Sequence, residues 1–311
     1  MSDNVNVEST EVLSKRLLDA VTRAEDGMLK NASDAGTQMI RRRLRENGFS
    51  RLILPYKQVS DADLNYLPDT ELPVIVEEME PDSPGAKSIP FNDTADTAFY
   101  RGDKFVVYFC KITTPEFTKN VDELRTYKND LRQIITDNAL KDLHVEEDGR
   151  FIKEVDRITS GQEAGMLQQF TTAGFITRSS FAEMCNYLED RNLNNGVFLM
   201  NRHTAKDYLK LDRAAIGGDL AETLFKQGLS GLNAAEVMGV RHIFTIKRDL
   251  VPDGVVYQFA EPDYLGRAYI LQDVTMYVEK KKDILRFSAQ EKIGLAIANV
   301  AGLNKVTFTR A

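Results

Sequence analysis

The clearest pattern of hydrophobic and polar positions lies between residues 113 and 143. Apolar residues recur there every three or four positions and charged residues fill the opposite face, which predicts one long amphipathic helix. Thr114 suits the N-cap and Pro115 the first helical position, so we expect the helix to begin there. At about 1.5 Å per residue it would be roughly 40 Å long, so the rest of the chain should pack along it. The predicted apolar stripe is Phe117, Val121, Leu124, Tyr127, Leu131, Ile134, Ile135, Ala139 and Leu143.

The segment before this helix divides into two parts with different periods. Residues 7–47 have helical periodicity, and the run Arg41 to Arg43 with Arg45 resembles a basic patch. Residues 1–48 nevertheless carry as many acidic as basic side chains, which favours a solvated or partner-facing helix over a DNA-binding arm.

Residues 49–112 contain short β-type runs separated by acidic and turn residues. Their apolar content is too low to close a core, so we expect these strands to pack on something else, such as another subunit. The runs are 52–54, 74–76, 88–91 and 105–109.

Beyond the long helix, the pattern predicts a turn at 146–150 and a second helix that Ser179 and Ser180 cap, with Glu183 at capping-box distance from Ser180. A buried strand at 196–200 then leads into a helix through Ala205 and Tyr208.

The last part of the chain is rich in strand patterns. Glycines at 217–218 and 228–231 indicate loops, and Lys280 to Lys282 indicates a solvated hairpin turn. Helices alternating with strands, followed by a run of strands, predict a mixed α+β fold. The predicted strands are GVRHIFTI, GVVYQFA, GRAYIL, VTMYVEK, DILRFSAQ, IGLAIANV and KVTFTR.

Composition narrows the class of protein. The chain has 311 residues, 42% hydrophobic and 28% charged, which is typical of a globular protein of about two domains. A net charge of −7 argues against a general nucleic-acid binder. Two cysteines do not form a disulfide framework, and the polar start lacks the pattern of a signal peptide. We therefore expect a soluble intracellular protein without a membrane span.

The residues that could carry enzyme chemistry do not converge. His144, His203 and His242 are far apart in sequence and have no metal-ligand spacing around them. His203 fits a polar helix start better than a catalytic base, and Cys185 on an apolar stripe fits a buried thiol. The acidic residues Asp61, Asp63, Glu77, Glu78, Glu80 and Asp82 fit solvated loop charges. Phosphate-loop and dinucleotide motifs are missing, so we expect no catalytic residues, no cofactor and no metal.

In order and character, the chain resembles the major capsid proteins of tailed bacteriophages, which have the Hong Kong 97-type fold. The resemblance covers nearly the whole chain and rests on several segments in one order, rather than on an invariant signature. These segments are the TTPEF start with its long helix, GVFLMNRHTAKDYLKL, MGVRHIFTIKRDLVPDG and the closing DILRFSAQEKIGLAIANVAGLNKVTFTR.

The resemblance implies an α+β capsid fold with five segments. These are an N-terminal helical arm at 1–48, an extended E-loop at 49–112, a P domain with its spine helix at 113–178, an A domain at 179–275, and return strands of the P domain at 276–311.

The resemblance also implies a function and partners. The chain would assemble in the host cytoplasm into hexamers and pentamers of an icosahedral virion shell around double-stranded DNA, without sequence-specific DNA binding. A portal and a decoration protein would be further partners. A separate scaffolding protein is also expected, because an arm of 48 residues is short for a built-in scaffold. Two alternatives remain, an encapsulin-type nanocompartment shell protein and a two-domain soluble enzyme.

Some relatives of this family join their subunits by an isopeptide bond between an E-loop lysine and a P-domain asparagine. Lys57 or Lys87 with Asn304 has the required residue types in matching regions. We favour ordinary surface residues at these positions, because both residue types are common on protein surfaces.

Overall fold

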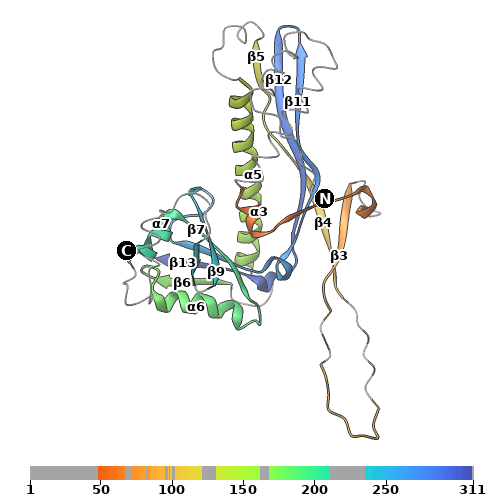
Figure 1. The fold of residues 1–311 in the computed structure, drawn as a ribbon, viewed down its shortest axis with the longest axis vertical. Coiled ribbons are helices and arrows are strands. Elements are labelled where there is room, and N and C mark those ends of the chain that lie inside the picture. Colours follow the sequence, from red (N-terminus) through yellow and green to blue (C-terminus); the bar gives the residue numbers. More distant parts are fainter. Residues whose placement is uncertain are drawn as a thin grey trace, which may run out of the picture.

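The structure of the protein, a computed structural model, combines two sheets and one long helix (Figure 1). Helix α5 (Leu131–Gly161) runs between a six-stranded sheet and a long β-hairpin. The structure describes residues 48–66, 72–81, 83, 85–94, 97, 99, 102–120, 131–161, 168–210, 235–237 and 239–309.

The seven-stranded sheet has the order β1-β11-β12-β4-β3-β2, and β5 also pairs with β12. Its longest members, β11 and β12, form an antiparallel hairpin whose register shifts between Ile270 and Thr275. Two short segments, α3 and the 3₁₀ turn η1, flank β1. The bounds are α3 (Ser50–Ile53), β1 (Tyr56–Gln58), η1 (Asp61–Asp63), β2 (Asn65–Tyr66), β3 (Pro73–Glu78), β4 (Lys104–Thr113), β5 (Phe117–Asn120), β11 (Gly266–Lys281) and β12 (Ile284–Ile297).

The six-stranded sheet has the order β6-β13-β10-β7-β9-β8. Helix α6 covers one of its faces, and α5 covers the other. The bounds are β6 (Gln169–Ala173), α6 (Arg178–Glu189), β7 (Asn195–Asn201), α7 (Arg202–Ala205), η2 (Lys206–Lys210), β8 (Ala235–Val237), β9 (Val240–Thr245), β10 (Val255–Ala260), η3 (Pro262–Tyr264), η4 (Val300–Gly302) and β13 (Leu303–Thr309).

Helix α5 connects the cores of the two sheets. Its earlier turns bury Ala139 and Leu143 against the β11–β12 hairpin. Its later turns bury Phe151 and Val155 against one face of the six-stranded sheet. The helix is therefore a core element along its described side chains, as its periodicity predicts for Ala139 and Leu143.

The predicted start of the long helix at Pro115 is wrong. Residues Phe117–Asn120 form β5, which pairs with Ile284 to Phe287 of β12. Thr114 is buried, and its hydroxyl oxygen accepts a hydrogen bond from the backbone N–H of Ala289 rather than capping a helix. Long-range pairing with β12 thus outweighs a local sequence that has the form of a helix start.

The predicted turn at 146–150 is also wrong, because α5 continues through these residues to Gly161. Glu147 and Asp148 are completely buried and are held by basic side chains from distant segments. These ion pairs stabilise the helix through residues 146–150, although the polar composition of this stretch is typical of a loop.

Three smaller predictions also differ from the structure. The run 52–54 lies in the short helix α3 and its C-cap rather than in a strand, because Ile53 and Leu54 pack on α5. The run 88–91 belongs to no strand. Helix α6 begins one turn earlier than predicted, since Thr177 is its N-cap and Ser180 supplies the reciprocal hydrogen bond at the third helical position.

The remaining strand predictions are confirmed at 74–76, 105–109 and 196–200, and β9, β10 and β13 lie where their patterns place them. GRAYIL with VTMYVEK forms one strand, β11, and DILRFSAQ with IGLAIANV forms β12. The predicted turn at Lys280 to Lys282 is confirmed only at Lys282, because Lys280 and Lys281 belong to β11. The helical arm at 7–47 and the glycine loops at 217–218 and 228–231 lie outside the described residues. The division into five segments stays a prediction, although β11 runs continuously across its boundary at 275.

Candidate functional site

The most conspicuous surface is the connection between β3 and β4, here called the extension, of which residues 79–81, 83, 85–94, 97, 99, 102 and 103 are described (Figure 1). It projects away from both sheets as a long open loop. Phe91 and Phe99 are almost fully exposed on it, and Ile89 is 45% exposed. Exposed aromatic side chains of this size are typical of a surface that another chain covers.

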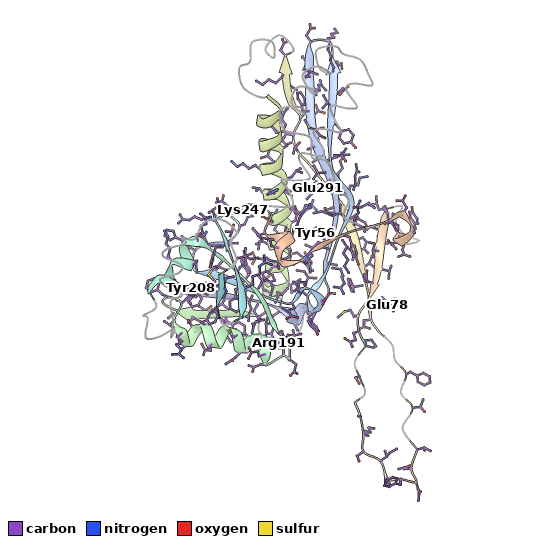
Figure 2. All side chains as sticks on the ribbon, viewed as in Figure 1. Tyr56, Glu78, Arg191, Tyr208, Lys247 and Glu291 are labelled. Atoms are coloured by element: carbon purple, nitrogen blue, oxygen red, sulfur yellow. The ribbon has the colours of Figure 1, made fainter. Side chains whose placement is uncertain are left out.

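The base of the extension is fixed to the body of the protein. The backbone N–H of Met79 donates to the carbonyl of Asp103 at 2.8 Å, and Lys104 pairs with Glu78 at 2.6 Å. A Cβ at Gly102 would lie 2.5 Å from the carbonyl oxygen of Met79, so only glycine permits this approach. Figure 2 shows Glu78 where the extension leaves the sheet.

Below that base, a small apolar cluster of Ile75, Val107 and Tyr269 anchors the strands. The phenol of Tyr269 donates a hydrogen bond to Glu77, which adds a polar link between β11 and β3. The extension is thus carried on an ordered base, and its exposed tip is presented to the surroundings.

The outer half of the β11–β12 hairpin is a second projecting element (Figure 1). Its inner side chains, including Met276 and Phe287, are buried toward α5. Tyr277 and Ile284 remain about half exposed near the hairpin turn. Two projecting hairpins with apolar side chains on their surfaces suit contacts between chains better than they suit an enclosed reaction site.

A cluster of buried charges lies where α3, α5 and β12 meet. The Arg51 guanidinium donates from Nε to Glu147 at 2.8 Å and from its terminal nitrogen to Glu291 at 3.2 Å. The two glutamate side chains are completely buried, and that of Arg51 is 11% exposed. One cation therefore holds two carboxylates together inside the fold.

A second ion pair lies beside this cluster and adds the six-stranded sheet to it. Lys247, just after β9, pairs with Asp148 at 2.5 Å, and Asp148 also accepts the backbone N–H of Ser50 at 3.0 Å. Figure 2 shows Lys247 and Glu291 beside the middle of α5. The charged cluster, defined as Arg51, Glu147, Asp148, Lys247 and Glu291, thus joins both sheets to the helix.

The cluster has three carboxylates and two cations, which changes how its acids titrate. Burial, then the neighbouring charge of Glu147, raises the pKa of Glu291 to about 8, although Arg51 opposes the shift. Burial also raises the pKa of Glu147. Glu147 Oε2 and Glu291 Oε1 have no hydrogen-bond partner in the described part of the chain. A proton on Glu291 relieves the excess negative charge at neutral pH.

The histidines and cysteines predicted to be non-catalytic do not form a common site. His144 and His242 are buried in different regions, whereas the backbone N–H of His203 donates to Asn201 at the start of α7. Burial raises the pKa of the Cys185 thiol to about 11, as expected for an unreactive thiol. Within the described ranges, no three His, Cys, Asp or Glu side chains form a group that could hold a metal ion.

Among the predicted loop acids, Asp61 and Asp63 lie exposed in η1, where the Ser60 hydroxyl donates to Asp63. Glu77 and Glu78 are strand residues of β3 rather than loop residues, Glu80 is exposed on the extension, and Asp82 lies outside the described residues.

The cross-link suggested by the family resemblance is not supported by the position of Asn304. Its side chain is completely buried in β13, and its amide nitrogen donates to Gln258 at 3.2 Å. Lys57 and Lys87 are exposed. The burial of Asn304 argues against this cross-link, which the sequence also disfavours, but it shows that Asn304 is not the ordinary surface residue that we expected.

The charged cluster was missed by sequence reasoning. Arg51 and Glu147 are 96 positions apart, and Arg51 and Glu291 are 240 apart, so no local spacing indicates their contact. The available signal in the sequence is that Glu147 lies four residues, about one helical turn, after Leu143, the last residue of the predicted apolar stripe.

Comparison with solved structures identifies the fold. The chain is similar to a chain of Mycobacterium phage Bobi, with a TM-score of 0.60, 10% identity and coverage of 86% of this chain and 92% of that one. For the bacteriophage PhiM1 mature capsid the TM-score is 0.59, with 9% identity and coverage of 85% and 88%. For a virus-like particle from Pyrococcus furiosus the TM-score is 0.51, with 16% identity and coverage of 95% and 98%.

Searches of protein-family models and of curated proteins found no match. The structural likeness is therefore one of fold. The protein has the mixed α+β fold of phage capsid proteins, which confirms at that level the resemblance found in the sequence. No helix in the described part of the chain is both long enough and apolar enough to cross a lipid bilayer.

Proposed function

We propose that the protein is the major capsid protein of a tailed bacteriophage and forms the hexamers and pentamers of an icosahedral shell around double-stranded DNA. One observation carries the proposal. The extension presents Phe91 and Phe99 to solvent on a chain that has a phage-capsid fold. Burial of these side chains by a neighbouring subunit would stabilise the contact between subunits. The extension therefore fits a protein that works in an assembly.

The extension forms the projecting part of the E-loop of the proposed shell subunit. The five expected segments then take their family roles, with the arm at 1–48, the E-loop at 49–112, the P domain at 113–178 and 276–311, and the A domain at 179–275. The charged cluster holds α3 against the helix and both sheets.

A portal, a separate scaffolding protein and a decoration protein are proposed partners, and the virion, assembled in the host cytoplasm, is the proposed location. The net charge of −7 fits a shell that encloses DNA without sequence-specific binding, because strong phosphate binding would oppose tight packing.

Electron microscopy of the purified protein tests the proposal, with a matched pair of variants. Phe91→Ser with Phe99→Ser should leave a subunit that unfolds cooperatively but forms no closed shells. Thr94→Ser changes a polar side chain on the same extension and should leave assembly intact. Normal shells from the double variant would contradict the assignment of the extension as the contact between subunits.

The likeness to a virus-like particle favours a second candidate, a nanocompartment shell protein of the encapsulin type. Particles isolated from the native source would then contain protein cargo instead of DNA, which nuclease treatment and mass spectrometry distinguish. The two-domain enzyme gains no support from these structures, which are phage chains, a capsid and a particle.

A further inference from the structure

A cavity of about 340 Å³ lies at the carboxyl ends of two adjacent parallel strands, β7 and β9. Asn201 and Thr245 are paired in register at these ends. In open sheets, the crevice beyond the carboxyl ends of parallel strands is a common place for ligands, because loops and helix starts converge there. The lining residues are Asn201, Arg202, His203, Lys206, Ile246 and Arg248.

Hydrogen bonds hold the two walls of this cavity together. The Asn201 side chain, on a residue only 2% exposed, accepts the backbone N–H of His203 at 2.8 Å and donates to the carbonyl of Val251 at 3.1 Å. The Thr204 hydroxyl accepts the N–H of Gly254 at 2.9 Å. The start of α7 and the turn after β9 are thus fixed to each other, so the cavity is preformed.

The cavity collects positive charge. Arg202, Lys206 and Arg248 line it, and the carboxylate of Asp253 lies 3.7 Å from Arg248 and 3.9 Å from the imidazole of His203. The Nε atom of Arg202 is buried and has no hydrogen-bond partner within the described ranges. This N–H has almost no accessible surface, so Arg202 would act on a ligand in the cavity through the charge of its guanidinium.

We propose that this cavity binds a phosphate-type oxyanion. Arginine presents planar donors that match phosphate oxygens, and the Lys206 ammonium adds a point charge. A water molecule takes about 30 Å³ in the liquid, so the cavity has room for a phosphate and part of an attached group. The site does not depend on the assignment of the protein as a shell subunit.

Free phosphate and a phosphate of nucleic acid share this chemistry, and the experiment separates them. Titration calorimetry on the full chain in its unassembled form, at low ionic strength, would use pyrophosphate in one arm and a short DNA duplex in the other. Competition shows whether both occupy one site. Binding of pyrophosphate alone assigns a small anion, and displacement of pyrophosphate by the duplex assigns nucleic acid.

Ile246 offers a matched pair of variants, because it lines the cavity and is 68% exposed, so its replacement spares the core. Ile246→Glu places a negative charge at the mouth and should weaken binding about tenfold or more, on the scale of one charge-assisted contact. Ile246→Gln has the same size without the charge and should bind like the parent. Arg248→Gln should also weaken binding.

Three results would overturn the proposal. The first is the lack of pyrophosphate and duplex binding by the parent chain. The second is equal binding by Ile246→Glu and Ile246→Gln. The third is an equal loss in Lys280→Gln, which removes a positive charge from the distant β11–β12 hairpin and tests for non-specific attraction. Thermal unfolding without ligand confirms that each variant is folded.

Discussion

Replacing Glu291 with glutamine tests the energetics of the charged cluster. Glutamine keeps the shape of the side chain and resembles the protonated acid, so Glu291→Gln removes the titration without opening a cavity. Burial and the charge of Glu147 raise the pKa of Glu291 to about 8 from an ordinary value of 4.5. The folded protein therefore binds a proton on Glu291 over a pH range in which the unfolded chain has released it.

The sign follows from proton linkage. Because the pKa of this acid is raised on folding, the native state loses stability as the pH rises through the window between the two pKa values. That window runs from about 4.5 to about 8, and the loss levels off above it. Each pH unit inside it costs at most about 1.4 kcal/mol, so the whole effect is on the order of a few kcal/mol.

Urea unfolding of the dilute full chain at about pH 6 and about pH 9 measures this effect, since the two values lie inside and above the window. Glu291→Gln should be more stable than the parent at both pH values, because glutamine does not release a proton when the chain unfolds. The difference should grow from about 2 kcal/mol at the lower pH to on the order of 5 kcal/mol at the higher pH. Glu154→Gln, on the partly exposed face of α5, should keep the pH dependence of the parent. Equal pH dependence in parent and Glu291→Gln would refute the reasoning.

Three further substitutions test other parts of the fold. Gly149→Ala should raise the melting temperature, because alanine favours a helix by about 1 kcal/mol and its Cβ meets Leu250 at an ordinary 3.6 Å. Gly102→Ala should loosen the base of the extension, where the new Cβ would lie 2.5 Å from the Met79 carbonyl oxygen, and should speed proteolysis there. Leu143→Asp should cost several kcal/mol in urea unfolding, because it places an unpaired charge in the core beside the hairpin.

Each of these has a clear contrary result. A lower melting temperature for Gly149→Ala would mean that α5 bends at this glycine. Unchanged proteolysis of Gly102→Ala would mean that the base opens without that close approach. Lys153→Asp changes an exposed position of α5 and should leave the subunit folded. If Leu143→Asp and Lys153→Asp unfold alike, the assignment of the buried face of α5 is wrong.

Much of the sheet structure could be predicted from sequence, because buried strands such as β7 and β10 are mostly apolar runs bounded by turn residues. The ends of α5 could not be predicted. Thr114 and Pro115 have the residue types of a helix start, yet Thr114 bonds Ala289 of a strand that follows much later in the chain. Local pattern does not contain that pairing.

The properties of the candidate sites that depend on local sequence could also be predicted. Inert thiols and solvated acids follow from residue type and neighbouring sequence, as Cys185 illustrates. The contact of Arg51 with Glu147 and Glu291 requires three distant segments to meet, and so does the burial of Asn304 beside Gln258. These features depend on topology, which hydrophobic periodicity alone does not determine.

The order of strands in the six-stranded sheet has a consequence for biosynthesis. β13 follows the β11–β12 hairpin in the chain, yet it lies between β6 and β10 and is the strand that β6 pairs with. During translation, one edge of β10 and the edge of β6 that pairs with β13 therefore stay unpaired until residues 303–309 leave the ribosome. A truncated chain would retain an unpaired edge that invites aggregation, so quality control can distinguish it from a finished subunit.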